Sequence, residues 1–163
     1  MNSNEKKRVE EEVVALLAEK EFTITCAESC TGGLVCASLV NVSGASTVLK
    51  SSLVTYAEEA KMKLLGVRET TLKNHGVVSE ETAFEMAVGA AKFAKADVAL
   101  SVTGIAGPEG GTKEKPVGMV CIGCYVKGKV KVRTHRFEGD RLQIREQSVR
   151  EALVLAKECI GKY

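Results

Sequence analysis

A serine at a predicted strand-to-helix turn is the first residue that could do chemistry. Ser29 follows a short apolar segment and precedes Gly32 and Gly33, which open a small-residue helix. N–H groups at a helix start can stabilise a developing oxyanion, and glycines let a substrate approach the backbone. A nucleophilic serine is therefore one interpretation. From position alone a capping role for Ser29 or Thr31 is favoured, because helix caps are common and nucleophiles are rare.

A nucleophilic serine needs a base, and the two histidines give this little support. His75 is predicted to be a turn residue after a short helix, and His135 alternates with charged residues on a predicted edge strand. The other option is a lysine kept neutral by burial or by a neighbouring cation. Lys61 lies five residues beyond Tyr56, at the start of a predicted helix. Most lysines are solvated, and spacing alone does not distinguish Lys61 from Lys63.

A glycine-rich stretch at 104–112 follows another predicted strand. It matches neither the phosphate-binding loop of nucleotide hydrolases nor the dinucleotide-binding fingerprint, but its backbone N–H groups could still hold an anion. Arg141 and Arg145 lie four residues apart on one face of the last predicted helix, where both could bind a phosphate or a carboxylate. Ion pairing with Glu138 or Glu146 explains them equally well.

Six cysteines raise the alternative of a thiol or metal protein that uses Cys26, Cys30 and the pair Cys121 and Cys124. The surroundings of the pair read as an apolar strand, and side chains three apart on a strand point to opposite faces. We therefore expect buried, reduced thiols. With only two aspartates and two histidines, the chain is also poor in the usual ligands of a metal-hydrolase centre, so no such centre is predicted.

The pattern of apolar residues predicts an α/β fold, in which helices cover a mixed sheet of about five strands. If the early strands are parallel, the loops that follow the first and third meet at one edge of the sheet, where ligands of such sheets bind. Ser79 is predicted to cap its helix, with acidic residues in the first turn. The predicted helices are 5–20, 31–40, 58–65, 79–96 and 141–160, and the predicted strands are 22–26, 48–56, 97–103 and the hairpin 117–126/129–137.

Composition limits the possible partners. The 163 residues predict a single domain, 1–163, and 45% hydrophobic with 27% charged residues is ordinary for a globular protein. A net charge of +2, 4% aromatic residues and no tryptophan argue against nucleic acid as a partner. No apolar run approaches the ~18–20 residues that cross a bilayer, and the first residues lack a signal-peptide pattern. We therefore predict a cytoplasmic protein with no membrane partner.

Eight blocks, collinear from about Phe22 to Ile160, resemble the CinA carboxy-terminal domain family. This family comprises competence- and damage-inducible proteins and stand-alone nicotinamide-nucleotide amidohydrolases. Several ordered blocks are far more specific than any single motif. The blocks are Ala27–Gly33, Val54–Tyr56, Glu59–Lys61, His75–Glu80, Thr103–Pro108, Gly110–Gly111, Glu114–Gly118 and Gly139–Arg141.

The resemblance implies a three-layer α/β/α domain that forms a homo-oligomer. It implies hydrolysis of the carboxamide of nicotinamide mononucleotide to nicotinate mononucleotide and ammonia, without a metal or cofactor. Ser29 matches the family's nucleophile and Lys61 its base, and Tyr56 is expected to hydrogen-bond to this pair. The alternative is a non-catalytic module of the same family that binds a nucleotide or recruits a partner.

On this reading, N–H groups at the start of helix 31–40 hold the oxyanion, and loop 104–111 with Arg141 or Arg145, or else Lys115, holds the phosphate. The family often has Ser-Asn where this chain has Ala57 and Glu58, and the extra negative charge would favour a protonated Lys61. The predicted substrate-binding residues are Glu28, Cys30, Thr31, Gly32, Gly33, Thr103, Gly104, Gly107, Gly110, Gly111, Lys115, Arg141 and Arg145.

Overall fold

The computed structural model describes residues 8–163, which are built around one five-stranded mixed sheet. The strand order is β2-β1-β3-β4-β5, with β1, β2 and β3 parallel, β4 antiparallel to β3, and β5 antiparallel to β4. The strands are β1 (Ile24–Glu28), β2 (Leu49–Val54), β3 (Val98–Gly104), β4 (Met119–Val126) and β5 (Lys129–Arg136).

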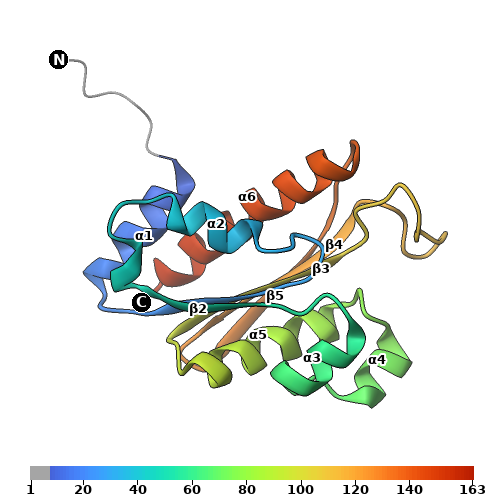
Figure 1. Cartoon of the computed structure of the whole chain (residues 1–163), viewed down its shortest axis with the longest axis horizontal. Helices are drawn as coiled ribbons and strands as arrows, with labels where there is room; N and C mark the ends of the chain where they lie inside the picture. Colours follow the sequence, from blue (N-terminus) through green and yellow to red (C-terminus); the bar gives the residue numbers. More distant parts are fainter. Residues whose placement is uncertain (1–7) are drawn as a thin grey trace.

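Six α-helices of the described residues cover the two faces of the sheet (Figure 1). One layer contains α1 (Val9–Glu19), α2 (Leu34–Val40) and α6 (Arg141–Ile160), and the other contains α3 (Glu58–Leu65), α4 (Glu69–His75) and α5 (Glu80–Ala94). A short 3-10 helix, Ala45–Thr47, precedes β2. The predicted α/β/α fold with a five-stranded mixed sheet is confirmed.

Burial explains why the strands take this order. The central strands β1 and β3 are buried along almost their whole length, as expected when helices cover both faces. The edge strands β2 and β5 are only partly buried. Two apolar cores result: one beneath α1, α2 and α6, with Leu17, Ile122 and Leu153, and a smaller one beneath α3 and α5, with Leu65 and Met86.

Most predicted elements are present, with small shifts at their ends. Helices 58–65 and 141–160 and the hairpin are found as predicted, and the Ser79 side chain caps α5 by accepting the N–H of Thr82. Helix α4 was missed, and His75, predicted as a turn residue, is its last residue. The predicted start of the first helix at residue 5 lies outside the described residues.

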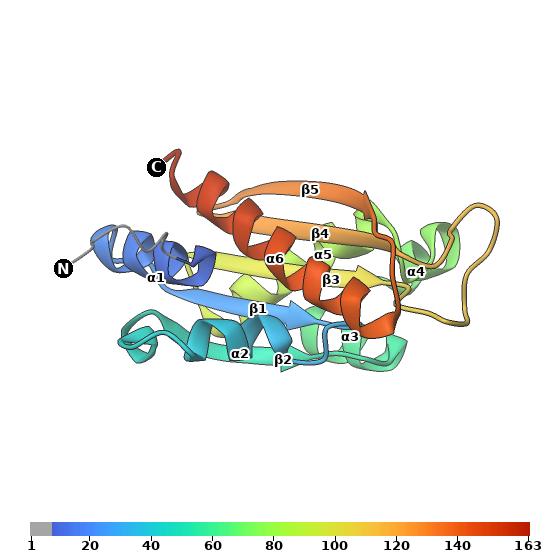
Figure 2. The same cartoon turned by 90° about the horizontal axis from the view of Figure 1, so that it is seen from above.

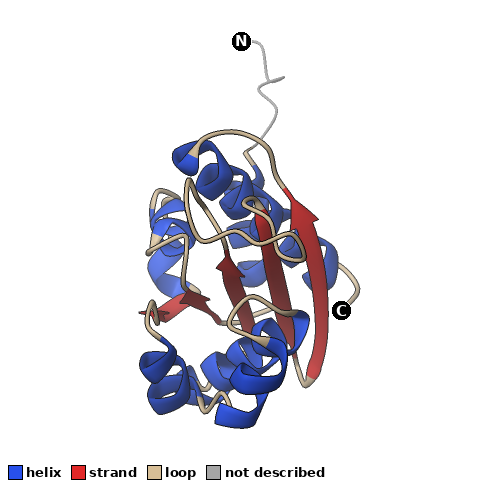
Figure 3. Ribbon diagram, turned by 90° about the vertical axis from the view of Figure 1, so that its right-hand side faces the viewer, coloured by secondary structure: helices blue, strands red, loops and turns tan. Residues whose placement is uncertain are grey.

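The three parallel strands end at the same edge of the sheet, as the prediction required (Figure 2). Glu28 at the end of β1 lies opposite Val54 on one side and Val102 on the other. Residues that directly follow β1 and β2 are therefore neighbours in space. Figure 3 looks onto this edge of the molecule.

A buried carboxylate determines where α2 begins. Glu28 is 0% exposed, and its oxygens accept the N–H groups of Gly33 and Val35 at 3.0 Å and of Cys36 at 2.8 Å. These are N–H groups that a helix cannot satisfy internally in its first turn. Residue 33, which precedes α2, has φ +103°, a conformation that favours glycine. The predicted helix over 31–40 thus begins three residues later, after a turn.

None of the described helices is both long and apolar enough to cross a membrane.

We expect Glu28→Gln to lower the free energy of unfolding by about 2–4 kcal/mol, because a buried amide has one acceptor oxygen and turns its NH2 towards the N–H groups of α2. Urea denaturation measures this change. Glu59→Gln, on the exposed side of α3, is the control and should change stability by less than about 0.5 kcal/mol. Equal stability of the two variants would show that Glu28 does not hold α2 in place.

Candidate active site

Ser29 and Lys61 meet at the carboxyl edge of the sheet. The Nζ atom of Lys61 lies 2.9 Å from the Oγ atom of Ser29, although 32 positions separate them in the sequence. Ser29 directly follows β1, and its N–H donates to the carbonyl of Val102 at 3.0 Å, which attaches it to β3. Lys61 reaches the same point from the first half of α3, the helix after β2. The parallel register of β1 and β2 therefore brings the two side chains together.

Main-chain carbonyls determine the orientation of the lysine. Nζ donates to the carbonyl of Thr55 at 2.6 Å and to that of Tyr56 at 3.2 Å. A neutral amine has two N–H groups and one lone pair, and the two carbonyls can only accept. When Lys61 is neutral, its lone pair therefore faces the Ser29 hydroxyl. When Lys61 is protonated, all three of its N–H groups have an acceptor.

Burial makes the neutral lysine accessible near physiological pH. Lys61 is 0% exposed, and loss of hydration lowers its pKa from 10.5 to about 8. The negative charges of the Cys30 thiolate form and of the Glu58 carboxylate act in the opposite direction and raise the pKa. The influence of Glu58 has the direction expected from the sequence, but burial outweighs it.

The turn after Ser29 presents unpaired N–H groups. Gly32 N–H donates to the carbonyl of Ser29 at 3.1 Å, closing the turn. Within residues 8–163, no other residue accepts the N–H of Cys30 or Thr31 in a hydrogen bond. The sequence placed such donors at the start of the helix instead, where Glu28 occupies those of Gly33, Val35 and Cys36. Glu28 therefore supports the turn and is not available to a substrate.

Arg145 braces the same turn from α6. Its Nε donates to the carbonyl of Cys30 at 2.9 Å and an Nη donates to that of Thr31 at 3.0 Å. These contacts use two of the five N–H groups of the guanidinium, and the expected role of Arg145 in phosphate binding stays a prediction. Gly32 lies directly beside it: a Cβ atom there would be 3.4 Å from Arg145 Nη2, and the backbone has φ +60°.

Tyr56 contacts Lys61 through its backbone carbonyl. Its carbonyl accepts from Lys61, whereas its side chain is 60% exposed and its hydroxyl accepts from Arg141 at 3.0 Å. The expected hydrogen bond from this hydroxyl to the pair is not present in the structure. The carbonyl of Thr55 was missed by the sequence analysis. The only available signal was its position directly after the strand beside β1.

Arg141 bridges two parts of the site. Besides Tyr56, its guanidinium donates to the carbonyl of Gly107 at 2.7 Å, which links the start of α6 to the glycine-rich loop. Arg141 is exposed, and a guanidinium has five N–H groups, so donors remain after these two contacts. Gly107 is buried, with φ +77°, and Gly110 and Gly111 are exposed in the same loop.

The other predicted binding residues of this region support the loops. Lys115 donates to the carbonyls of His75 and, at 2.7 Å, of Val78, between α4 and α5. Thr103 is buried and its hydroxyl donates to the carbonyl of Val77 at 2.9 Å. At Gly104 a side chain has no room, because a Cβ atom would lie 2.6 Å from Val120. Lys115 and Thr103 therefore hold the connection before α5 in place.

The cysteines are buried except for Cys36, which is partly exposed. Burial raises the pKa of Cys30, which follows Ser29, to about 11, so its thiol is protonated at neutral pH. Cys121 contacts Thr134, and Cys124 lies in the core under α6, so the two face opposite sides of β4, as predicted. No cluster of three metal-ligating side chains occurs among the described residues.

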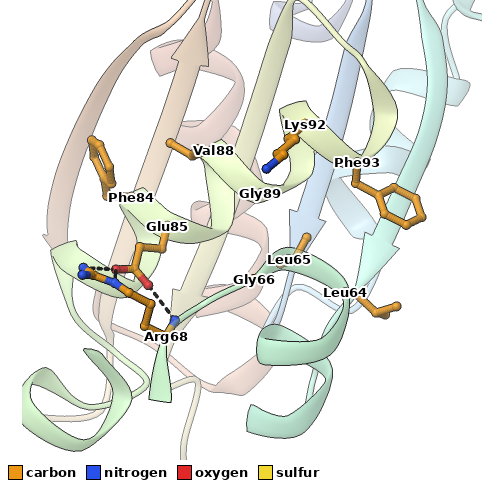
Figure 4. Close-up of a pocket in the computed structure, with 10 residues that line it drawn as sticks. All are labelled: Leu64, Leu65, Gly66, Arg68, Phe84, Glu85, Val88, Gly89, Lys92 and Phe93. Atoms are coloured by element: carbon orange, nitrogen blue, oxygen red, sulfur yellow. Dashed lines mark hydrogen bonds and ion pairs between the residues drawn. The ribbon is translucent and has the colours of Figure 1, made fainter. Parts of the chain in front are cut away.

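A cavity of about 480 Å³ lies between α3 and α5, away from the Ser29–Lys61 pair (Figure 4). Leu64, Phe84 and Phe93 line it, and an ion pair of Arg68 and Glu85 lies at one end. Neither Ser29 nor Lys61 lines this cavity, so the cavity is a separate feature of the surface.

Known proteins match this chain over nearly its whole length. The model of the CinA C-terminal domain matches residues 6–160. A CinA-like protein of Kosmotoga olearia is 54% identical over 145 residues, and a relative from Caldicellulosiruptor bescii is 52% identical over 155 residues. These matches cover 89% and 95% of this chain but only 35% and 38% of those proteins, so the chain spans little more than a third of their length.

Two solved structures have the same fold over nearly the whole chain. A CinA superfamily protein of Klebsiella pneumoniae has a TM-score of 0.92 at 34% identity, and the match covers 95% of this chain and 97% of that one. The competence/damage inducible protein CihA of Agrobacterium tumefaciens has a TM-score of 0.90 at 37% identity, with 98% and 99% covered. The sequence match, the fold and the collinear motifs lead to one conclusion: the chain belongs to the CinA C-terminal domain family.

Proposed function

We propose that the protein is an amidohydrolase that converts nicotinamide mononucleotide to nicotinate mononucleotide and ammonia, with Ser29 as nucleophile and Lys61 as base. The observation that carries the proposal is the 2.9 Å contact between a serine hydroxyl and a fully buried amine. The substrate follows from the resemblance of the motifs to nicotinamide-nucleotide amidohydrolases. The cytoplasmic location and the homo-oligomer stay predictions.

The first step forms an ester between Ser29 and the substrate. The lone pair of neutral Lys61 takes the hydroxyl proton while Oγ attacks the carboxamide carbon. The lysine becomes an ammonium whose N–H groups bond to Thr55, Tyr56 and the reacting oxygen. Lys61 then gives the proton to the departing nitrogen, and ammonia leaves. In the second step Lys61 takes a proton from water and the hydroxide attacks the ester. The bond to Oγ breaks, Lys61 returns the proton to Oγ, and nicotinate mononucleotide leaves.

The N–H groups of Cys30 and Thr31 are the donors we propose for the negative oxygen of the tetrahedral intermediate. They follow the nucleophile directly. Arg145 holds the peptide group that contains the Thr31 N–H through the Cys30 carbonyl, and the Gly32 N–H holds the one that contains the Cys30 N–H through the Ser29 carbonyl. Donors of this kind typically lower the barrier by ~3–4 kcal/mol each, because they need not reorganise during the reaction.

Arg141 is the cation we propose for the substrate phosphate. Arg145 and Lys115 are committed to main-chain carbonyls, whereas Arg141 is exposed and lies between Tyr56 and the loop that contains Gly107. The N–H groups of Gly110 and Gly111 are the further donors expected on the same side.

Ser29→Ala and Lys61→Ala should each reduce ammonia release from nicotinamide mononucleotide by at least about a thousandfold, because either change removes one half of the nucleophilic pair. Enzymatic determination of ammonia measures this. Ser38→Ala in α2 and Lys63→Ala, on the exposed side of α3, are the matched controls and should retain activity. Substrate that raises the melting temperature of the wild type without any ammonia release would favour the non-catalytic nucleotide-binding module.

The activity should rise with pH because only neutral Lys61 can accept a proton. With a pKa of about 8, roughly a tenth of the molecules have the neutral amine at pH 7. We expect kcat/KM to increase nearly tenfold from pH 6 to pH 7 and to level off above about pH 9. Lys61→Arg should be inactive at every pH, since a guanidinium does not lose its proton. A flat profile from pH 6 to 9 would contradict the assignment of Lys61 as base.

A further inference from the structure

A second pair of reactive groups lies at the other end of α6, away from the Ser29–Lys61 pair. Cys124 on β4 and Cys159 near the end of α6 both line a cavity of about 480 Å³. Both belong to the apolar core under α6, and each thiol shifts the pKa of the other. Thirty-five positions separate them in the sequence, so only the packing of α6 on the sheet brings them together.

The two thiols differ in exposure. Cys124 is 1% exposed and Cys159 is 9% exposed, so Cys159 is the more accessible from the cavity. The remaining lining includes three cationic side chains, those of Lys129, Lys131 and Lys162. A small, neutral oxidant can therefore reach the sulfur atoms, and positive charge lies around the opening.

The neighbouring Cys124 thiol favours the thiolate form of Cys159. A hydrogen bond from Cys124 lowers the pKa of Cys159, and Lys131 and Lys162 lower it further. Burial and the carboxylate of Glu158 act in the opposite direction, but Glu158 also forms ion pairs with Lys131 and Lys162, which partly offset its charge. The hydrogen bond and burial both raise the pKa of Cys124, which stays a protonated thiol. One thiolate beside one thiol is the arrangement that two-step oxidation requires.

We propose that Cys159 and Cys124 form an oxidisable dithiol site that reacts with hydroperoxides to give an intramolecular disulfide. The Cys159 thiolate attacks one oxygen of hydrogen peroxide, the O–O bond breaks, and hydroxide leaves with the electron pair, which forms a sulfenic acid on Cys159. The sulfur of Cys124 then attacks the sulfur of Cys159, its proton goes to the departing oxygen, and water leaves. Two thiols are oxidised and one peroxide is reduced to water.

The other cysteines of the chain are internal comparisons. Burial raises the pKa of Cys26 well above its usual value, as it does that of Cys30. Cys121 lies on the opposite face of β4, where its thiol contacts the hydroxyl of Thr134. Cys36 is partly exposed but lines none of the cavity that Cys159 faces. Selective reaction at Cys159 therefore separates this site from general oxidation of exposed sulfur.

The test is peptide mapping of the wild-type protein after a modest excess of hydrogen peroxide. We expect the number of free thiols, titrated after denaturation, to fall from six to four, and a single bridge to link the peptides of Cys124 and Cys159. This measurement needs no variant and does not depend on amidase activity. A bridge between other cysteines, a bridge between chains, or retention of all six thiols would overturn the proposal.

Two variants separate the roles of the pair. In Cys124→Ser the sulfenic acid on Cys159 has no partner thiol, so it should be trapped by dimedone as one adduct on that peptide. In Cys159→Ser the five remaining thiols should survive the same treatment. Cys121→Ser is the matched control on the same strand and should still lose two thiols. A dimedone adduct mainly on Cys36, or loss of two thiols in Cys159→Ser, would contradict the assigned order of attack.

Discussion

The site depends on one buried amine, that of Lys61, which hydrogen-bonds to oxygen atoms. Lys61 is 0% exposed, and its Nζ atom contacts two carbonyls and one serine hydroxyl. The shift of its pKa from 10.5 to about 8 means that keeping the ammonium buried at pH 7 costs the folded protein about 3 kcal/mol. The rest of the domain must offset this cost, and the same shift makes the amine a usable base.

The fold holds in position the groups that surround the Lys61 amine. The parallel register of β1 and β2 brings Ser29 and Thr55 close together, so that the Ser29 hydroxyl and the Thr55 carbonyl both contact Nζ. Glu28, buried at the end of β1, accepts N–H groups at the start of α2. Arg145 of α6 donates to the carbonyls of the turn between β1 and α2. Glu28 and Arg145 were both expected from the sequence to bind the substrate. In the structure they hold the backbone whose N–H groups we propose as substrate-binding donors.

The fold was largely predictable because its signals are local and repetitive. Alternating strands and helices, the Ser79 cap and the hairpin turn at 127–128 all depend on neighbouring residues. Helix α4 was missed because it has only seven residues and two buried side chains, Thr71 and Leu72. Residue types could suggest a pair of Ser29 and a lysine. Because Lys61 and Lys63 lie on the same short helix, the choice of Lys61 came from a family motif.

The contacts of long polar side chains were the part that the sequence could not supply. Arg141 and Arg145 lie on one face of α6, yet one reaches Tyr56 and the other the turn after Ser29. Lys115 donates to carbonyls 40 and 37 positions away. The Cys124–Cys159 pair depends in the same way on how a helix packs across a sheet, which no spacing within the sequence reveals.

The protonation of Lys61 is the property on which the account depends most, and NMR can follow it directly. A titration of the Lys61 Cε and Nζ chemical shifts, assigned with Lys61→Arg as the reference, should show a midpoint at about pH 8. A Lys61 signal that stays protonated up to pH 10 would contradict the account, because the amine could then not take the proton of Ser29.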